Sequence, residues 1–219
     1  MSALRSLVLC TLLLSLGRPA IATPVLDFTG GGFFGNGPGD ETAGWRFTVT
    51  GPITVDALGV FDYQANGLTD SHLISLWTNG GTLLTSTTVT TANSTPVAST
   101  SSDGNWRFTP ISPLILLPGD YVVGANYVAL DPDFRAAVSR ASTIPGVTFD
   151  AARESGGGPG FPTGEESLNG GWFGPNLDVV PEPMTMFLGG TGLLALAYAG
   201  RRRLFGRESE ANKRVDLTG

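Results

Sequence analysis

Turn-forming residues interrupt this chain at short, regular intervals between positions 45 and 140. Clusters such as Gly51-Pro52, Asn79-Gly80-Gly81 and Pro118-Gly119-Asp120 separate short runs that are rich in β-branched and aromatic residues. No run of a dozen residues has the 3.6-residue period of an amphipathic helix. Short strands with evenly spaced turns are typical of β-sandwiches and jelly rolls. We therefore expect an all-β fold, a single antiparallel β-sandwich of jelly-roll type.

Most of the expected strands lie in the first two thirds of the chain. Asn79-Gly80-Gly81 stands between two β-type runs and predicts a hairpin. Residues 141–180 contain two glycine clusters and are expected to be looser, with one last strand from Trp172. The strands expected before it are Pro24–Thr29, Trp45–Thr50, Ile53–Asp62, Leu73–Thr78, Thr82–Thr91, Asn105–Pro110, Ile111–Leu117, Tyr121–Leu130 and Arg135–Ser139.

One four-residue sequence occurs twice. Trp45-Arg46-Phe47-Thr48 returns as Trp106-Arg107-Phe108-Thr109. Equivalent strand pairs, one from each sheet, explain the echo, and chance similarity in a β-rich chain explains it equally well. In the first case each Trp and Phe faces the core and each Arg faces outward, because neighbouring residues of a strand alternate.

The body of the chain is acidic. Residues 23–180 contain five arginines and fifteen Asp and Glu residues, a net charge of −10, whereas the whole chain carries −6. An acidic surface repels nucleic acid and anionic lipid, so nucleic acid is excluded as a partner. Charged residues are only 15% of the chain and apolar residues 41%, which excludes a highly charged disordered protein.

The first 22 residues have the three parts of a secretory signal peptide. Arg5 supplies the positive charge, Leu7–Leu16 forms an apolar run, and Ala20-Ile21-Ala22 is a small-x-small cleavage site. We expect cleavage after Ala22 and a mature start at Thr23; a retained N-terminal anchor is the alternative. Cys10 is the only cysteine, so the mature chain would have no disulfide, thiol nucleophile or cysteine metal site.

A second apolar segment lies near the C-terminus. Met184–Gly200 is a 17-residue apolar run, which would be about 25 Å long as a helix, and Arg201, Arg202 and Arg203 follow it. The arginines place that end in the cytoplasm by the positive-inside rule. We expect a transmembrane helix over 184–200, the body on the outer side and a disordered polar cytoplasmic tail over 204–219. A buried core helix is the alternative.

The residues around this segment resemble a known sorting signal. Pro181-Glu182-Pro183, the apolar run and the Arg201–Arg203 cluster are similar to the PEP-CTERM signal of Gram-negative bacteria. The resemblance implies recognition by exosortase, a membrane-embedded cysteine protease or transpeptidase, and delivery to the cell surface or to the exopolysaccharide matrix of a biofilm. The inner membrane would hold the chain during export. The sixteen residues after the arginines are a longer tail than such signals usually have.

The body resembles a recurrent ectodomain of such proteins. The body is similar to the β-sandwich modules classed as DUF4082-like at Trp45-Arg46-Phe47, Val60-Phe61-Asp62, Ser71-His72 followed by Leu76-Trp77, Gly124-Ala125-Asn126-Tyr127 and Phe173-Gly174-Pro175-Asn176. The resemblance spans roughly residues 33–178 and carries no activity with it. The expected domains are a signal peptide at 1–22, a β-sandwich at 23–180, a sorting signal at 181–203 and the tail.

Catalytic motifs are missing from the sequence. His72 is the only histidine, and its neighbour Ser71 would point to the opposite face of a strand, which argues against a catalytic triad. We expect His72 to be a surface or cross-strand residue. With no nucleophile elbow either, we predict that the chain is not an enzyme and needs no cofactor.

Two kinds of ligand remain open. Asp40, Glu41, Asp131 and Asp133 are the candidate calcium ligands, because they offer hard oxygen atoms in two short clusters. Exposed tryptophans could stack on sugar, although buried tryptophans are commoner.

The function expected first is therefore an exported, non-enzymatic structural module. A carbohydrate- or calcium-binding adhesion module is the alternative, and a secreted glycoside-active enzyme with paired carboxylates is the second alternative.

Overall fold

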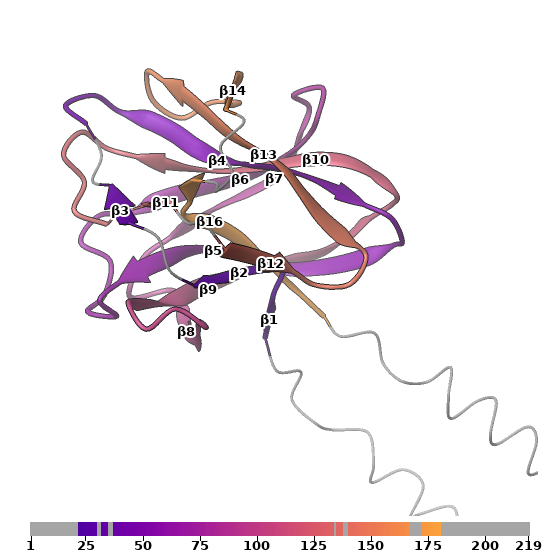
Figure 1. The fold of residues 1–219 in the computed structure, drawn as a ribbon, viewed down its shortest axis with the longest axis horizontal. Helices are drawn as coiled ribbons and strands as arrows, with labels where there is room; N and C mark the ends of the chain where they lie inside the picture. Colours follow the sequence, from indigo (N-terminus) through magenta and orange to yellow (C-terminus); the bar gives the residue numbers. More distant parts are fainter. Residues whose placement is uncertain are drawn as a thin grey trace, which may run out of the picture. The chain divides into compact units, whose positions relative to one another are not determined.

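The fold is an antiparallel β-sandwich (Figure 1). In a computed structural model of the chain, the described residues are 22–29, 32–34, 37–133, 135–137, 140–166 and 172–180. Those residues form strands and turns, and no helix occurs among them. The expected all-β sandwich is confirmed for this part of the chain.

Two large sheets form the sandwich. The five-stranded sheet has the order β1 (Thr23–Pro24), β16 (Pro175–Val179), β5 (Ile53–Tyr63), β9 (Gly104–Leu116) and β8 (Thr95–Ala98). The six-stranded sheet has the order β14 (Gly164–Glu166), β13 (Val147–Gly156), β4 (Glu41–Val49), β10 (Gly119–Tyr127), β6 (His72–Thr78) and β7 (Leu83–Val89).

Two smaller sheets complete the described fold. One joins β15 (Trp172–Phe173), β11 (Arg135–Ala137) and β3 (Gly32–Phe34), and the other joins β12 (Arg140–Thr143) and β2 (Leu26–Thr29). Every strand pair is antiparallel.

The repeated Trp-Arg-Phe-Thr sequence marks the core on both sides. Trp45 and Phe47 lie on β4 of the six-stranded sheet, and Trp106 and Phe108 lie on β9 of the five-stranded sheet. All four side chains are buried in the core. The two copies therefore lie in opposite sheets with their aromatic residues facing inward, as the first of the two explanations requires.

The strand positions agree with the sequence for β4 to β7 and differ in several later places. The hairpin at Asn79-Gly80-Gly81 joins β6 to β7, with Gly81 at a φ of 86°. β9 is one continuous strand where two were expected, and β13 is a ten-residue strand where a looser region was expected. The last expected strand is divided between β15 and β16.

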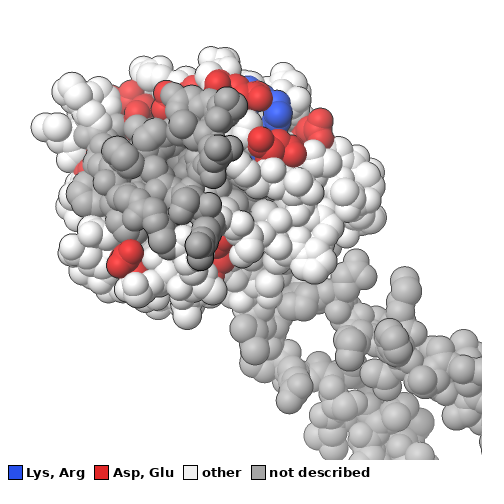
Figure 2. All heavy atoms as spheres, in the orientation of Figure 1, with Lys and Arg blue, Asp and Glu red and all other residues white. Residues whose placement is uncertain are grey.

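The predicted export segments fall outside this description. Ala20, residues 181–203 and the tail are not among the described residues, and none of the described residues forms a helix suited to crossing a membrane. Acidic groups are spread over the face of the molecule shown in Figure 2, with few basic groups among them.

Candidate functional site

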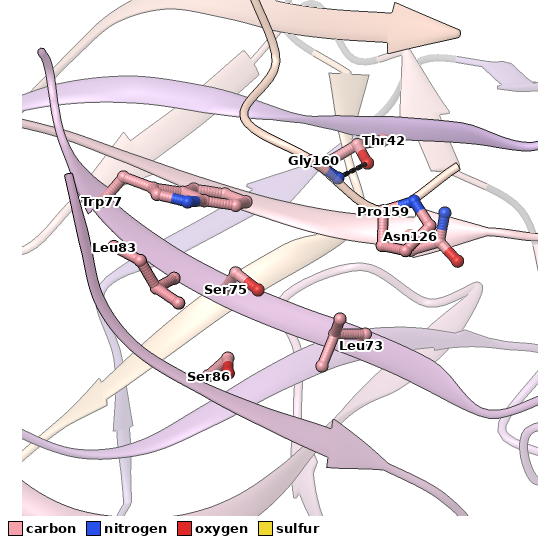
Figure 3. A pocket seen from close by; sticks show the side chains of 9 residues that line it. All are labelled: Thr42, Leu73, Ser75, Trp77, Leu83, Ser86, Asn126, Pro159 and Gly160. Atoms are coloured by element: carbon pink, nitrogen blue, oxygen red, sulfur yellow. Dashed lines mark hydrogen bonds between the residues drawn. The ribbon is translucent and has the colours of Figure 1, made fainter. Parts of the chain in front are cut away.

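A small pocket lies on the outer face of the six-stranded sheet (Figure 3). Its volume is about 200 Å³. Strands β4, β10, β6 and β7 form its floor, and the segment 157–161, which follows β13, forms one wall. The lining residues are Thr42, Leu73, Ser75, Trp77, Leu83, Ser86, Asn126, Pro159 and Gly160.

Strand alternation directs these side chains outward. In β6, Ile74 and Leu76 enter the core, so Leu73, Ser75 and Trp77 face the opposite side. The indole of Trp77 lies over Gly124 of β10, where an added Cβ would come within 3.2 Å of the ring. A glycine at this position therefore allows the ring to lie close against the strand.

Thr42 fixes the wall of the pocket. Its hydroxyl donates a hydrogen bond to the carbonyl of Gly158 at 3.1 Å and accepts one from the backbone N–H of Gly160 at 3.2 Å. Gly157 and Gly158 have φ values of 98° and 90°, which side-chain-bearing residues rarely adopt. The edge of Phe161 then packs on Trp77, with ring centroids 5.8 Å apart. The two glycines allow the bend of segment 157–161, and the contacts of Thr42 and Phe161 hold this wall next to the floor of the pocket.

Two serine hydroxyls lie beside the tryptophan. Ser75 and Ser86 are register partners on β6 and β7, and neither side chain has a hydrogen-bond partner within the part of the chain that the structure describes. Leu83 is 54% exposed beside them. Every lining side chain is uncharged, so the pocket is suited to a small neutral ligand that has both hydroxyl groups and an apolar face.

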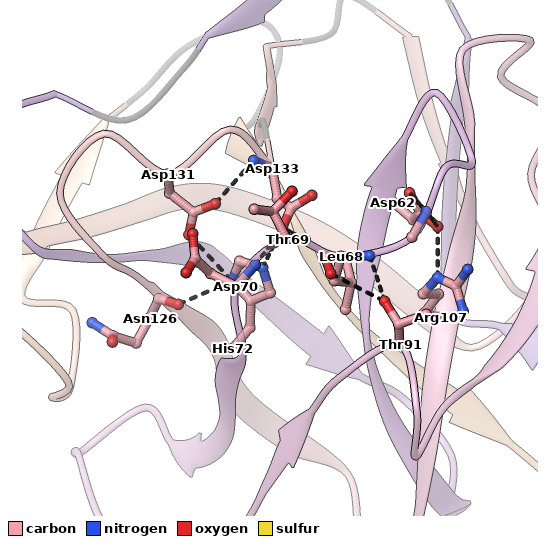
Figure 4. A network of polar contacts seen from close by, with 11 residues as sticks. Asp62, Leu68, Thr69, Asp70, His72, Thr91, Arg107, Asn126, Asp131 and Asp133 are labelled. Carbon is pink, nitrogen blue, oxygen red and sulfur yellow. Dashed lines mark hydrogen bonds and ion pairs between the residues drawn. The ribbon is translucent and has the colours of Figure 1, made fainter.

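A buried polar cluster lies at one end of the same sheet (Figure 4). His72, at the start of β6, is fully buried, and Asp131 and Asp133 come from the segment after β10. His72 Nε2 lies 3.2 Å from Asp133 Oδ2, and His72 Nδ1 lies 3.7 Å from Asp131 Oδ2. Of the two expectations for His72, the surface position is wrong, because this acidic segment folds over it, whereas a cross-strand contact is present to Asn126 on the neighbouring strand β10.

The histidine ring faces acceptors on both sides. Nδ1 lies 3.2 Å from the Asn126 carbonyl oxygen, and the Asp133 carboxylate beside Nε2 also accepts hydrogen bonds from the backbone N–H groups of Thr69 and Asp70. Burial by itself lowers the His72 pKa, but the hydrogen bond to Asp133 and the charges of Asp131 and Asp133 outweigh it and raise that pKa. Burial raises the pKa of Asp131.

This cluster gathers the described groups best suited to a metal ion. One ligand atom each from His72, Asp131 and Asp133 lies within 4.8 Å of the others. Asp131 Oδ2 is buried and accepts no hydrogen bond from the described residues, which leaves it available to a cation. Asp131 and Asp133 were expected from the sequence, whereas His72 was not expected to join them.

The other two expected calcium ligands lie elsewhere. Asp40 Oδ1 accepts a hydrogen bond from the backbone N–H of Ala129, and Glu41 begins β4 opposite Tyr127. Neither belongs to the cluster of His72, Asp131 and Asp133. Asn126 links that cluster to the pocket, because its carbonyl faces His72 and its side chain lines the pocket wall.

The fold and these sites define an all-β sandwich module with a small uncharged pocket on one sheet. Residues 35–169 match the family model described as "Domain of unknown function (DUF4082)", and the chain belongs to that family. No curated protein matches the chain.

The chain is also similar to a solved structure described as "Structure of a family 35 carbohydrate binding module from an environmental isolate". It is 19% identical to this chain with a TM-score of 0.30, and the match covers 59% of this chain and 88% of that one. At these values the likeness identifies no ligand for this chain.

Proposed function

We propose that this protein is exported to the cell surface or extracellular matrix and that its β-sandwich binds carbohydrate without cleaving it. The observation that carries the proposal is the uncharged pocket in which Ser75 and Ser86 lie beside Trp77. A sugar presents hydroxyl groups along its edge and C–H groups on its faces. Serine hydroxyls and an indole provide the matching polar and apolar contacts.

The size and charge of the pocket narrow the ligand. At about 200 Å³ it is smaller than the roughly 300–1,000 Å³ of pockets for drug-sized molecules, which suits one sugar unit of a glycan. The absence of a charged group among its lining residues favours a neutral sugar over an acidic one. Leu83 at the open rim supplies apolar area for the next unit.

Binding without cleavage follows from the same lining. Glycoside hydrolysis uses two carboxyl groups about 5–10 Å apart on either side of the scissile bond. No aspartate or glutamate lines this pocket. This lining supports a pocket that recognises a sugar and does not cleave it.

Export is proposed from the sequence. The signal peptide with its Ala20 and Ala22 cleavage residues would direct secretion, and Pro181, Glu182 and Pro183 with the Arg201–Arg203 cluster would be read by exosortase. Intact mass analysis of the protein from its native host tests this: loss of residues 1–22 and of the segment after the PEP motif is expected. A full-length species in the inner membrane would contradict it.

Glycan-array binding followed by calorimetry tests the pocket. Leu83→Ala removes the exposed rim of the pocket and is expected to weaken binding several-fold, and Ser86→Phe is expected to abolish it by filling the open side. Ile115→Ala is the matched control, because Ile115 is 63% exposed on β9 of the other sheet. Equal binding by all four proteins would contradict the assignment of the pocket.

A divalent cation is the second candidate ligand, and the buried oxygen Asp131 Oδ2 favours it. With one imidazole nitrogen and two carboxylates, the cluster fits zinc or manganese better than calcium, which prefers oxygen ligands alone. A bound cation would replace one of the two ring protons of His72. Calorimetric titration with zinc, manganese and calcium tests this, with Asp131→Asn expected to abolish binding and the exposed-site variant Asp103→Asn to retain it.

A further inference from the structure

We propose that the α-amino group of Thr23, which removal of residues 1–22 would create, binds as an ammonium ion to the Asp178 carboxylate beside Asp56. Cleavage of the signal peptide would then complete the fold as well as release the chain. The inference rests on the export half of the proposed function. It is independent of the pocket and of exosortase processing.

The nitrogen atom of the future amino group is already at this carboxylate. Thr23 begins β1, which pairs with β16 through Thr23 opposite Val179 and Pro24 opposite Asp178. The Thr23 backbone nitrogen donates a hydrogen bond to Asp178 Oδ1 at 2.5 Å. Cleavage after Ala22 changes only the chemistry of this nitrogen, from an amide N–H to an ammonium group.

The position of the nitrogen is held by the residues that follow it. Asn176 of β16 donates from Nδ2 to the Leu26 carbonyl at 2.6 Å and accepts at Oδ1 from the Leu26 N–H at 3.2 Å. The Val25 N–H also donates to the Leu177 carbonyl at 2.9 Å. Residues 23–26 therefore stay aligned along β16 whether or not residues 1–22 are attached.

The Asp178 carboxylate has no positive partner among the side chains that the structure describes. Asp178 is 7% exposed, and one carboxylate oxygen of Asp56 is buried with no hydrogen-bond partner among the described residues. None of the ion pairs formed by described side chains includes Asp56 or Asp178. Burial raises the Asp178 pKa to about 6, and the charge of Asp56 adds to this effect.

An ammonium group supplies what this site lacks. An amide has one N–H and no charge, whereas a protonated amine has three N–H donors and a positive charge. A free α-amino group has a pKa of about 7.7–8.0 and is therefore charged at neutral pH. One group can thus donate to Asp178 and oppose the charges of both carboxylates.

The reactivity of the amine tests the proposal on the full chain. The protein is expressed with its own signal peptide in a host without exosortase, its N-terminus is identified by mass spectrometry, and it is treated with acetic anhydride at pH 7. Lys213 is the only lysine and serves as an internal reference for reactivity. Acetylation of Thr23 relative to Lys213 is expected to be at least about tenfold slower in the folded chain than in urea, which corresponds to one unit of raised amine pKa.

Variants separate the carboxylate from the rest of the fold. Asp178→Asn is expected to remove most of the protection, whereas Asp103→Asn, at an exposed position, is expected to leave it unchanged. If Asp178→Asn does not fold, Asp56→Asn at a half-buried position replaces it as the test. The protection of the Thr23 amine from acetylation must fall in that variant too. Full protection in every folded variant would overturn the proposal.

The outcomes distinguish this inference from export itself. A chain that begins at a residue other than Thr23 overturns both the docking and the cleavage after Ala22. A chain that begins at Thr23 but reacts equally fast when folded and unfolded overturns the docking alone. Slow reaction that depends on Asp178 supports both.

Discussion

Asp62 is a fully buried carboxylate whose charge is matched by one arginine. Arg107 Nε lies 2.5 Å from Asp62 Oδ2, and the backbone N–H of Gly67 donates to the same carboxylate. Arg46 holds the equivalent place in the other copy of the Trp-Arg-Phe-Thr sequence, but its ion pair with Glu165 is partly exposed. Two arginines in the same local sequence therefore have different electrostatic surroundings.

This difference predicts unequal effects of the two matched substitutions. Arg107→Ala leaves Asp62 charged and buried, which costs roughly 3–5 kcal/mol of unfolding free energy. Arg46→Ala breaks an exposed pair, for which about 1 kcal/mol or less is expected. Urea unfolding of the two variants measures both values. Equal losses would show that burial does not set the strength of these pairs.

At the scale of elements, two facing glycines control how β4 and β10 approach each other. Gly44 and Gly124 are register partners. A Cβ on Gly44 would lie 1.9 Å from the Val123 carbonyl oxygen, whereas a Cβ on Gly124 would first meet Thr42 Cγ2 at 3.0 Å and then the Trp77 ring at 3.2 Å. A side chain at position 44 would therefore clash with the backbone of β10, whereas one at position 124 would meet only the side chains of Thr42 and Trp77.

Alanine at these two positions should therefore have different consequences. Gly44→Ala forces two central strands apart and is expected to prevent folding, or to cost more than about 4 kcal/mol. Gly124→Ala is expected to fold, since Thr42 and Trp77 need to shift by only a few tenths of an ångström. It raises the floor of the pocket, so weaker glycan binding is expected. Circular dichroism with glycan titration checks both, and unchanged binding by a folded Gly124→Ala would argue against the pocket.

The presence of the strands could be predicted from the sequence more fully than their pairing. Turn residues and the alternation of polar and apolar residues predicted β4, β5, β6 and β7. The bulge between Phe149 and Ala151 breaks this alternation in β13, so the sequence pattern did not indicate that strand. β9 continues through Pro110 because β8 pairs only with its first half, so no ladder hydrogen bond is needed from the proline on that side.

The sites depend on the same long-range pairing. The pocket combines four strands and one loop, and His72 meets Asp131 and Asp133 only after β6 and β10 become neighbours. Alternation could show which side chains of β6 face outward, but it could not show which strands lie beside them. Asp131 and Asp133 were expected as a local pair because only Pro132 separates them in the sequence, and that part of the site could be found without the fold.

At the scale of the whole molecule, the first strand of the sandwich, β1, pairs with its last strand, β16. β16 receives residues 23–26 along its length and ends two residues before Pro181. An acidic body with five arginines has few cations to spare for buried carboxylates. The amino group that we propose at Thr23 would be a source of positive charge that the described side chains do not provide at Asp178.

The pH dependence of stability follows from this arrangement. With an uncharged nitrogen at Thr23, the Asp178 pKa is about 6 in the folded chain and about 3.9 in the unfolded chain. Its contribution to stability is then complete below about pH 4 and is lost as the pH rises through 6, a loss on the order of 3 kcal/mol. An ammonium group lowers the folded pKa and removes that loss.

Acetylation of Thr23 restores the uncharged state, so urea unfolding of the acetylated and free mature chains between pH 4 and 7.5 measures the effect. The acetylated chain is expected to lose stability relative to the free chain as the pH rises. His72 titrates in both chains, so its contribution cancels in the difference. Asp56 is the one neighbouring charge that raises the Asp178 pKa, and backbone hydrogen bonds from Thr23 and Val179 lower it. In Asp178→Asn the difference should vanish; if it persists there, another group receives the N-terminus.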